Sequence, residues 1–127
     1  MSKTLTLTLA TSLAIFASPV SSADGEQVFK ICQSCHSAKA DGEKKFGPNL
    51  SGIIGRNCGA VEGYEYSEGY LKACKSSNIK WTEPEIHTYL DNPTKYLKSK
   101  GGGRSKMSFM LKKEDERRAV IEYLKTF

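Results

Sequence analysis

The chain has 127 residues, of which 39% are hydrophobic, and a formal net charge of +5; this length suits one domain and leaves little room for two. A mildly basic chain without a recognisable DNA- or RNA-binding motif is not expected to bind nucleic acid. A single small domain buries a limited share of its surface, so we expect a bound cofactor or a cross-link to stabilise it.

The first 23 residues have the layout of a secretory signal. Lys3 opens a short positive region, the uncharged stretch 4–20 follows, and Ser21-Ser22-Ala23 places small residues at a cleavage site. The stretch is shorter than the ~20 predominantly apolar residues of a transmembrane anchor, and Thr and Ser interrupt it. We therefore expect residues 1–23 to be removed and residues 24–127 to form the mature domain.

A helix is predicted at the start of the mature chain, where Asp24 and Gln27 have the spacing of a capping box. Its apolar residues Val28, Phe29 and Ile31 are expected to face a core. The helix then continues into a pair of cysteines.

These cysteines belong to Cys32-Gln33-Ser34-Cys35-His36, the C-x-x-C-H signature of covalent haem c attachment. On a helix, positions 32 and 35 share one face, so both thiols can add to the vinyl groups of one haem, and His36 can ligate its iron. A thioredoxin-like redox pair is disfavoured because no strand pattern precedes the motif. A zinc site is disfavoured because a fourth good ligand is missing.

Cys58 and Cys74 remain as an even pair, and in an exported protein we expect them to form a disulfide. Such a bridge would contribute about 3 kcal/mol in the chain-entropy model. They lie in the stretch 37–80, which is rich in glycine and has almost no helical or strand periodicity. Over forty residues without regular structure normally argue against a compact domain. A bound haem would resolve the conflict, because loops can wrap around it.

The remaining elements are helical. Thr82-Glu83-Pro84-Glu85 predicts a second capping box, for a helix that continues to Leu90 and ends before Asn92-Pro93. A short helix is predicted over 94–100, followed by a loop at the three glycines 101–103. The last helix is predicted over 113–126, with an apolar stripe at Val120, Tyr123, Leu124 and Phe127. The predicted fold class is all-α and loop-rich.

The candidates for the second axial ligand are His87, Met107 and Met110. His87 falls on the side of its helix away from the apolar residues, so we expect it to face solvent. Met107 is favoured because it lies in a loop, after the glycine run and among basic residues. A thioether ligand raises the reduction potential relative to bis-histidine ligation. A closed, six-coordinate iron separates an electron carrier from a haem enzyme.

Taken together, the ordered motifs resemble class I cytochrome c, and specifically the bacterial cytochrome c2 group. Beyond the cysteine motif they are Gly47-Pro48-Asn49-Leu50, Gly55-Arg56, Gly63-Tyr64-Glu65-Tyr66, Trp81, Asn92-Pro93-Thr94-Lys95-Tyr96, Lys106-Met107-Ser108-Phe109, Leu111-Lys112-Lys113 and 119–125. The long stretch before Met107 and the added pair Cys58 and Cys74 are similar to iso-cytochrome c2 of purple photosynthetic bacteria. The glycine run is expected to make the Met107 side of the haem less rigid.

The resemblance implies a small fold in which the first and last helices pack together around one haem. Gly25 and Phe29 would contact Tyr123 and Leu124. The implied haem-site roles are a hydrogen bond from His36 Nδ1 to the Pro48 carbonyl, distal ligation by Met107 with Tyr89 beside its sulfur, and propionate contacts from Arg56, Tyr66 and Trp81.

The implied function is a periplasmic, monomeric single-electron carrier rather than an enzyme. Its donor would be a cytochrome bc1 complex or a periplasmic dehydrogenase, and its acceptor a photosynthetic reaction centre or a cytochrome c oxidase. Basic residues around the exposed haem edge would meet acidic faces of these membrane complexes: Lys39, Lys98, Lys106 and Lys112. The alternatives are a haem peroxidase or gas-binding protein with an open distal site, and a stress or signalling role.

Overall fold

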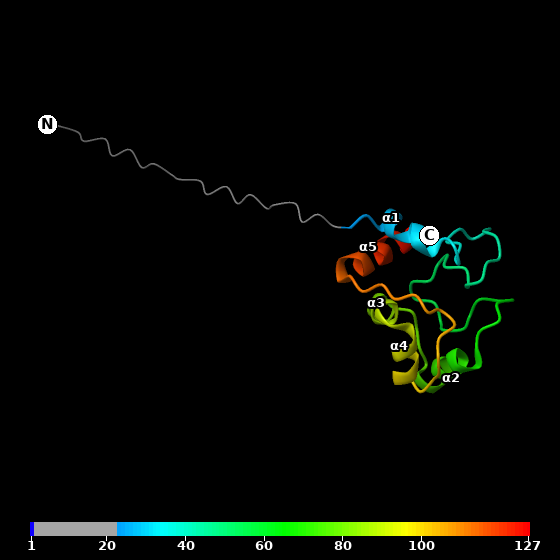
Figure 1. The fold of residues 1–127 in the computed structure, drawn as a ribbon. Coiled ribbons are helices and arrows are strands. Elements are labelled where there is room, and N and C mark those ends of the chain that lie inside the picture. Colours follow the sequence, from blue (N-terminus) through cyan, green and yellow to red (C-terminus); the bar gives the residue numbers. More distant parts are fainter. Residues whose placement is uncertain (2–22) are drawn as a thin grey trace.

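The computed structural model describes Met1 and residues 23–127, so the expected signal sequence lies outside the described residues except at its two ends. In the described part, five helices and no strand are present (Figure 1). They are α1 (Gly25–Cys32), α2 (Glu68–Ser77), α3 (Glu83–Asp91), α4 (Pro93–Ser99) and α5 (Glu114–Leu124). One isolated antiparallel bridge joins Asn57 to Lys80. The all-α prediction is confirmed.

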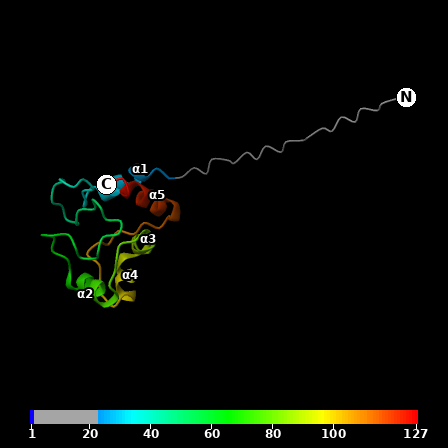
Figure 2. The same cartoon turned by 180° about the vertical axis from the view of Figure 1, so that it is seen from behind.

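Helices α1 and α5 cross at one end of the molecule, and both views show them together (Figures 1 and 2). Their backbones meet at Gly25, where a Cβ atom would lie 2.8 Å from the Cβ atom of Tyr123. Phe29 packs on Tyr123 with ring centroids 5.5 Å apart. The close approach requires glycine and joins the two ends of the domain.

The N-terminus of α1 has the predicted N-cap, because the Asp24 carboxylate accepts a hydrogen bond from the Glu26 amide at 3.0 Å. Gln27 does not complete the capping box but accepts a bond from Lys30 at 2.9 Å. Ile31 was expected in the core and is instead 53% exposed. It borders a surface cavity beside the cysteine motif.

Helix α2 contradicts the expectation that 37–80 lacks regular structure. It begins at Ser67, whose hydroxyl accepts from the Tyr70 amide at 3.2 Å, and ends at Asn78 in the left-handed conformation. The helix buries only Ala73 among its ten residues, so it carries almost no apolar periodicity. Tertiary contacts with α4 and with the glycine run stabilise it instead.

Cys58 and Cys74 are joined by a disulfide, with Cα atoms 5.3 Å apart. The bridge ties the middle of α2 to the loop that follows Arg56. The Cys58 amide also donates to the Ile79 carbonyl at 3.0 Å, so both the middle and the end of α2 are attached to this loop.

Helices α3 and α4 follow each other and pack together, and α3 also packs on α5. The predicted capping box of α3 is wrong: the Thr82 side chain makes no capping bond, although Pro84 lies in the first turn. At α4, Asn92 supplies the cap by accepting from the Lys95 amide at 3.0 Å. The last helix ends two residues earlier than predicted, at Leu124.

The core forms where the helices meet the loops. Its fully or nearly buried members are Phe29, Ala73, Trp81, Tyr96, Leu97, Leu111, Val120 and Ile121. Over the described residues, no helix has both the length and the apolar character needed to span a membrane.

Residues 101–103 form a loop, as predicted. The Gly103 amide donates to the Gly69 carbonyl of α2 at 3.1 Å, and the Gly102 amide donates to Leu97 at 2.8 Å. The run therefore lies on α2 with its backbone bonded on both sides.

Candidate haem site

Three adjoining cavities of about 310, 100 and 40 Å³ lie between the cysteine motif, α3 and the loop before α5. Pro48 and Met107 border all three. Side chains from distant parts of the chain therefore enclose one divided crevice. We call these three cavities the crevice.

The two free cysteines of the motif both border the largest of these cavities. A turn holds them in place, since the amides of Cys35 and His36 donate to the Cys32 carbonyl at 3.0 and 2.9 Å. Burial raises the pKa of the Cys32 thiol. Two unpaired thiols on one cavity fit the attachment of a single macrocycle.

His36 is oriented by a hydrogen bond from its Nδ1 to the Pro48 carbonyl at 2.8 Å, the contact that the resemblance implies. Burial lowers the pKa of the imidazole, the bond to Pro48 opposes this effect, and the charge of Lys45 adds to it. The ring is thereby held with Nε2 free to act as a ligand. Gly47 must be glycine here, because a Cβ atom would lie 2.6 Å from His36 Nδ1.

The structure separates the three candidates for the second ligand. Met107 borders the same two larger cavities as His36. Met110 is 45% exposed and borders none of the three. His87 also lies outside the crevice. It is partly exposed, and its Nε2 accepts from Arg117 Nε at 3.3 Å. Burial and the Arg117 charge lower its pKa.

Aromatic residues form the wall of the crevice on the α2 and α3 side. Tyr70, Trp81 and Tyr89 border the 100 Å³ cavity, and Tyr66 borders the smallest one. Their rings are in contact, with centroids 4.9 Å apart for Tyr66 and Tyr70 and 5.0 Å apart for Trp81 and Tyr89. Trp81 Nε1 donates to the Tyr70 hydroxyl at 3.2 Å. This wall is made of large aromatic rings, which can pack against the apolar surface of a haem.

Tyr70 was not singled out from the sequence, because it lies on α2, where no periodicity marks a helix. Its burial raises the pKa of its hydroxyl, which is the behaviour of a phenol held away from water. The exposed apolar residues at the mouth of the crevice were missed as well: Ile31, Phe46 and Phe109.

Arg56 does not border the crevice. Its guanidinium donates to the Asn49 carbonyl at 2.7 Å and to the Ser51 carbonyl. Burial lowers the pKa of the guanidinium, while Tyr66 and Tyr70 raise it.

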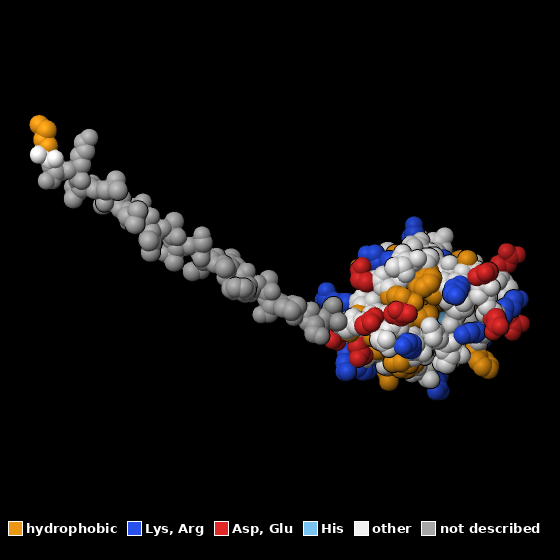
Figure 3. Space-filling view, turned by 90° about the horizontal axis from the view of Figure 1, so that it is seen from above, with side chains coloured by type: hydrophobic (Ala, Val, Ile, Leu, Met, Phe, Trp, Pro, Cys, Tyr) orange, Lys and Arg blue, Asp and Glu red, His pale blue; other side chains and the backbone are white. Residues whose placement is uncertain are grey.

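The four lysines expected around the haem edge are all exposed but do not form one cluster at the crevice. Lys106 borders it, with its Nζ over the Tyr64 ring at 5.9 Å. Lys112 pairs with Asp91 at 3.3 Å. Lys39 and Lys98 border none of its cavities. From above the α1–α5 end, basic and acidic side chains alternate (Figure 3).

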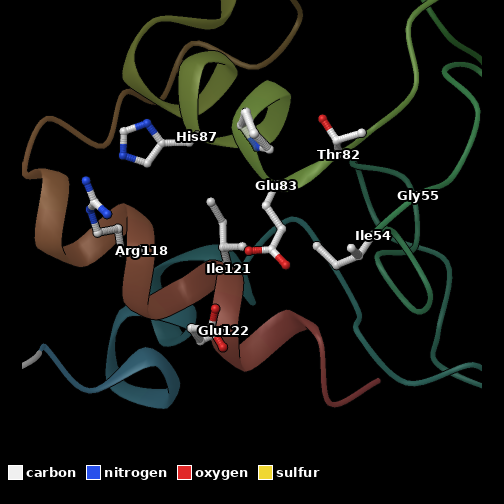
Figure 4. Close-up of a pocket in the computed structure, with 9 residues that line it drawn as sticks. Ile54, Gly55, Thr82, Glu83, His87, Arg118, Ile121 and Glu122 are labelled. Atoms are coloured by element: carbon white, nitrogen blue, oxygen red, sulfur yellow. The ribbon is translucent and has the colours of Figure 1, made fainter.

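A separate cavity of about 880 Å³ lies between α3, α5 and the loop at Ile54 (Figure 4). Its charged residues have partners within the protein: Glu83 pairs with Lys125 at 3.0 Å, and Arg118 pairs with Glu114. No thiol borders it. Its lining therefore does not fit the attachment of a haem.

The residues of the crevice fit haem c on three grounds: two free thiols on one cavity, an imidazole fixed by the Pro48 carbonyl, and an aromatic wall. The lining of the crevice as a whole comes from the loops and from four of the five helices, α1, α2, α3 and α5.

The family model for cytochrome c matches residues 22–127. Cytochrome c-550 of Novispirillum itersonii is 44% identical over 107 residues, which cover 82% of this chain and 96% of that protein. Cytochrome c2 iso-1 of Rhodospirillum centenum is 37% identical over 112 residues, which cover 81% and 92%. The solved structure of cytochrome c2 from Rhodospirillum centenum superposes with a TM-score of 0.75 and 36% identity, over 81% of this chain and 94% of that one. The chain belongs to the cytochrome c family, within its bacterial cytochrome c2 group, and is an electron carrier with one covalently attached haem c rather than an enzyme.

Proposed function

We propose that this carrier works in the periplasm and that His36 and Met107 hold its haem iron from opposite sides. The observation that carries the proposal is the lining of the crevice. His36 and Met107 are its only histidine and methionine among the described residues, and both border the two larger cavities. Bound haem supplies an iron that accepts and releases one electron at a time.

The two side chains would contribute differently. His36, whose Nδ1 donates to Pro48, presents Nε2 with a fixed ring orientation and an increased basicity. The Met107 thioether favours the ferrous state and so raises the reduction potential. Because both positions are filled by the protein, no open site remains for a small oxidant, which favours a carrier over a peroxidase.

We propose that Tyr66, Trp81 and Arg56 lie nearest the haem propionates. Tyr66 and Trp81 border the crevice, and the charge of Arg56 interacts with the Tyr66 hydroxyl. A guanidinium there would offset negative charge without itself entering the crevice. Tyr89, which borders the same cavity as Met107, would lie beside its sulfur.

Docking would use the mouth of the crevice, where the exposed apolar residues Phe46 and Phe109 surround the motif and Lys106 adds a positive charge. We propose that Lys39, Lys98 and Lys112 add longer-range attraction to acidic faces of membrane redox complexes. Such charges increase the encounter rate more than the affinity.

The amino-terminal segment supports the proposed place of action, because it has the layout of a secretory signal. We propose that residues 1–23 direct export and are removed, leaving residues 24–127 as the working domain. The donor would be a bc1-type complex or a periplasmic dehydrogenase, and the acceptor a photosynthetic reaction centre or a terminal oxidase.

Carbon monoxide binding by the reduced holoprotein tests the closed site. We expect slow, incomplete binding by the wild type and by Met110→Ala, and fast, complete binding by Met107→Ala. Fast and complete binding by the wild type would favour a gas-binding protein or peroxidase and overturn the proposal.

Electron transfer with a purified bc1 complex tests the docking surface. The rate should fall as ionic strength rises, because the Debye length shortens. Lys106→Glu should reduce the rate at low salt more than Lys75→Glu, which makes the same charge change on α2 outside the crevice. Equal effects of the two variants would remove Lys106 from the docking surface.

A further inference from the structure

The backbone of the glycine run touches the backbone of α2. A Cβ atom on Gly102 would collide with the Gly69 carbonyl oxygen and lie 2.5 Å from the Cβ atom of Ala73. A Cβ atom on Gly69 would lie 2.9 Å from the Cα atom of Gly103. No side chain fits between the two segments, so Gly69 and Gly102 are required by contact rather than by turn geometry.

Helix α2 is itself fixed to the rest of the domain. The disulfide holds its middle through Cys74, and the bond from the Cys58 amide to Ile79 holds its C-terminal end at 3.0 Å. The Ser77 hydroxyl donates to the Lys100 carbonyl at 3.0 Å, just before the glycine run. A helix that buries little apolar surface is thus held in place by the disulfide and by these hydrogen bonds.

The glycine run leads within four residues to Met107 through one buried polar residue. Ser105 is 7% exposed. Its amide donates to Thr94 Oγ1 at 3.1 Å, and its hydroxyl accepts from the Met107 amide at 3.1 Å. The same hydroxyl lies 3.2 Å from the Tyr89 hydroxyl. Ser105 therefore links the Met107 backbone to α3 and α4, and the glycine run is joined to Ser105 along the chain.

We infer that α2, stapled by the Cys58–Cys74 disulfide, is the platform that positions Met107, and that Gly69 and Gly102 form the contact that transmits this support. The inference rests on the proposed role of Met107 as an iron ligand. Three consecutive glycines that made no contacts would sample many backbone conformations. Binding of Met107 to the iron would then cost the conformational entropy of these residues. Because the three glycines pack on a helix that is fixed by a disulfide, the Met107 thioether is held in place before it binds the iron.

The test uses the ferric holoprotein and follows two signals during guanidinium unfolding. One is the near-infrared charge-transfer band of the thioether–iron bond, and the other is far-UV circular dichroism. In Gly102→Ala and Gly69→Ala we expect the band to disappear at a lower denaturant concentration than the helices do, opening a gap absent from the wild type. The reduction potential should fall in both variants, because weaker thioether ligation favours ferric iron.

Gly69→Ala is the more informative variant, since alanine favours helix over glycine and should strengthen α2 by itself. Ile121→Ala provides the control, because Ile121 is buried on α5 outside the crevice. It should lower both midpoints together and leave the potential unchanged. If the two glycine variants behave like Ile121→Ala, or like the wild type, the platform inference is overturned.

If the glycine variants do not yield holoprotein, the ferric double variant Cys58→Ser/Cys74→Ser makes the same test. It should open the same gap, because it lacks the bridge to α2 while the thioether bonds to haem stay intact. If the band and the helices are still lost at the same denaturant concentration, the role of the disulfide is overturned. Met107→Ala separates this failure from a failure of the proposed function: a band that survives in that variant means that another residue is the ligand.

Discussion

Removal of the Cys58–Cys74 bridge has a stability effect that can be worked out from the chain. The bridged residues are 16 positions apart, and closing a loop of this size removes about 3 kcal/mol of conformational entropy from the unfolded state at 25 °C. Replacement of both residues by serine keeps a similar side-chain size. The double variant should therefore unfold with a free energy about 3 kcal/mol lower than the wild type with its disulfide intact.

The assay is guanidinium unfolding of the holoprotein followed by far-UV circular dichroism. All samples are kept ferrous with ascorbate, which reduces the haem iron but leaves the disulfide intact. Wild-type protein whose disulfide is also cleaved by a thiol reductant is the matched control, and it should have the stability of the double serine variant, because both lack the cross-link. Haem attachment through Cys32 and Cys35 should be the same in all three samples. A loss below about 1 kcal/mol, or a wild type that is as stable with its disulfide cleaved as with it intact, would refute the unfolded-state argument.

Three further predictions follow from single side chains. Phe29→Ala removes the ring that packs on Tyr123 between α1 and α5 and should lower the free energy of unfolding by about 3–5 kcal/mol, measured by chemical denaturation; a loss below about 1 kcal/mol would contradict the packing. Gly47→Ala should reduce the yield of covalently attached haem, measured by the pyridine haemochrome, since its Cβ atom would displace the His36 ring; a normal yield with normal spectra would contradict that. The hydrogen bond from Tyr96, and then Lys100, hold the pKa of Glu85 below its ordinary value of 4.5, so the stability advantage of the wild type over Glu85→Gln should be present at neutral pH and shrink as the pH falls below about 4.5. A stability difference that does not change with pH would show that protonation of Glu85 is not linked to folding.

The parts of the fold that could be predicted are those that depend on neighbouring residues. The C-x-x-C-H motif needs only a helical turn, and Asp24 caps the helix that contains it. The apolar stripe of α5 follows a period that packing on α1 requires. Both elements are specified by local chemistry.

Helix α2 could not be predicted in this way, because its stability comes from residues far away. It buries one alanine and is held by a disulfide and by the backbone of the glycine run. The loop over 101–103 could be predicted, but its contact with α2 could not. Three glycines indicate freedom when read alone, but Gly69 on α2 provides a surface that only glycine can approach.

In the site too, some residues could be predicted from the sequence and others could not. His36 and Met107 could be proposed from residue type and loop position, and both border the crevice. The Ser105 contacts with Met107 and Tyr89 depend on the mutual placement of α3, α4 and the loop. The hydrogen bond between His87 and Arg117 of α5 could not be predicted, because it depends on how α3 packs on α5.

The most direct test of the account is the near-infrared spectrum of the ferric holoprotein in three forms: wild type, Met107→Ala and Met110→Ala. The account predicts the thioether–iron band in the wild type and in Met110→Ala, and its complete loss in Met107→Ala. A wild type without the band, or a Met107→Ala protein that keeps it, would contradict ligation of the iron by Met107.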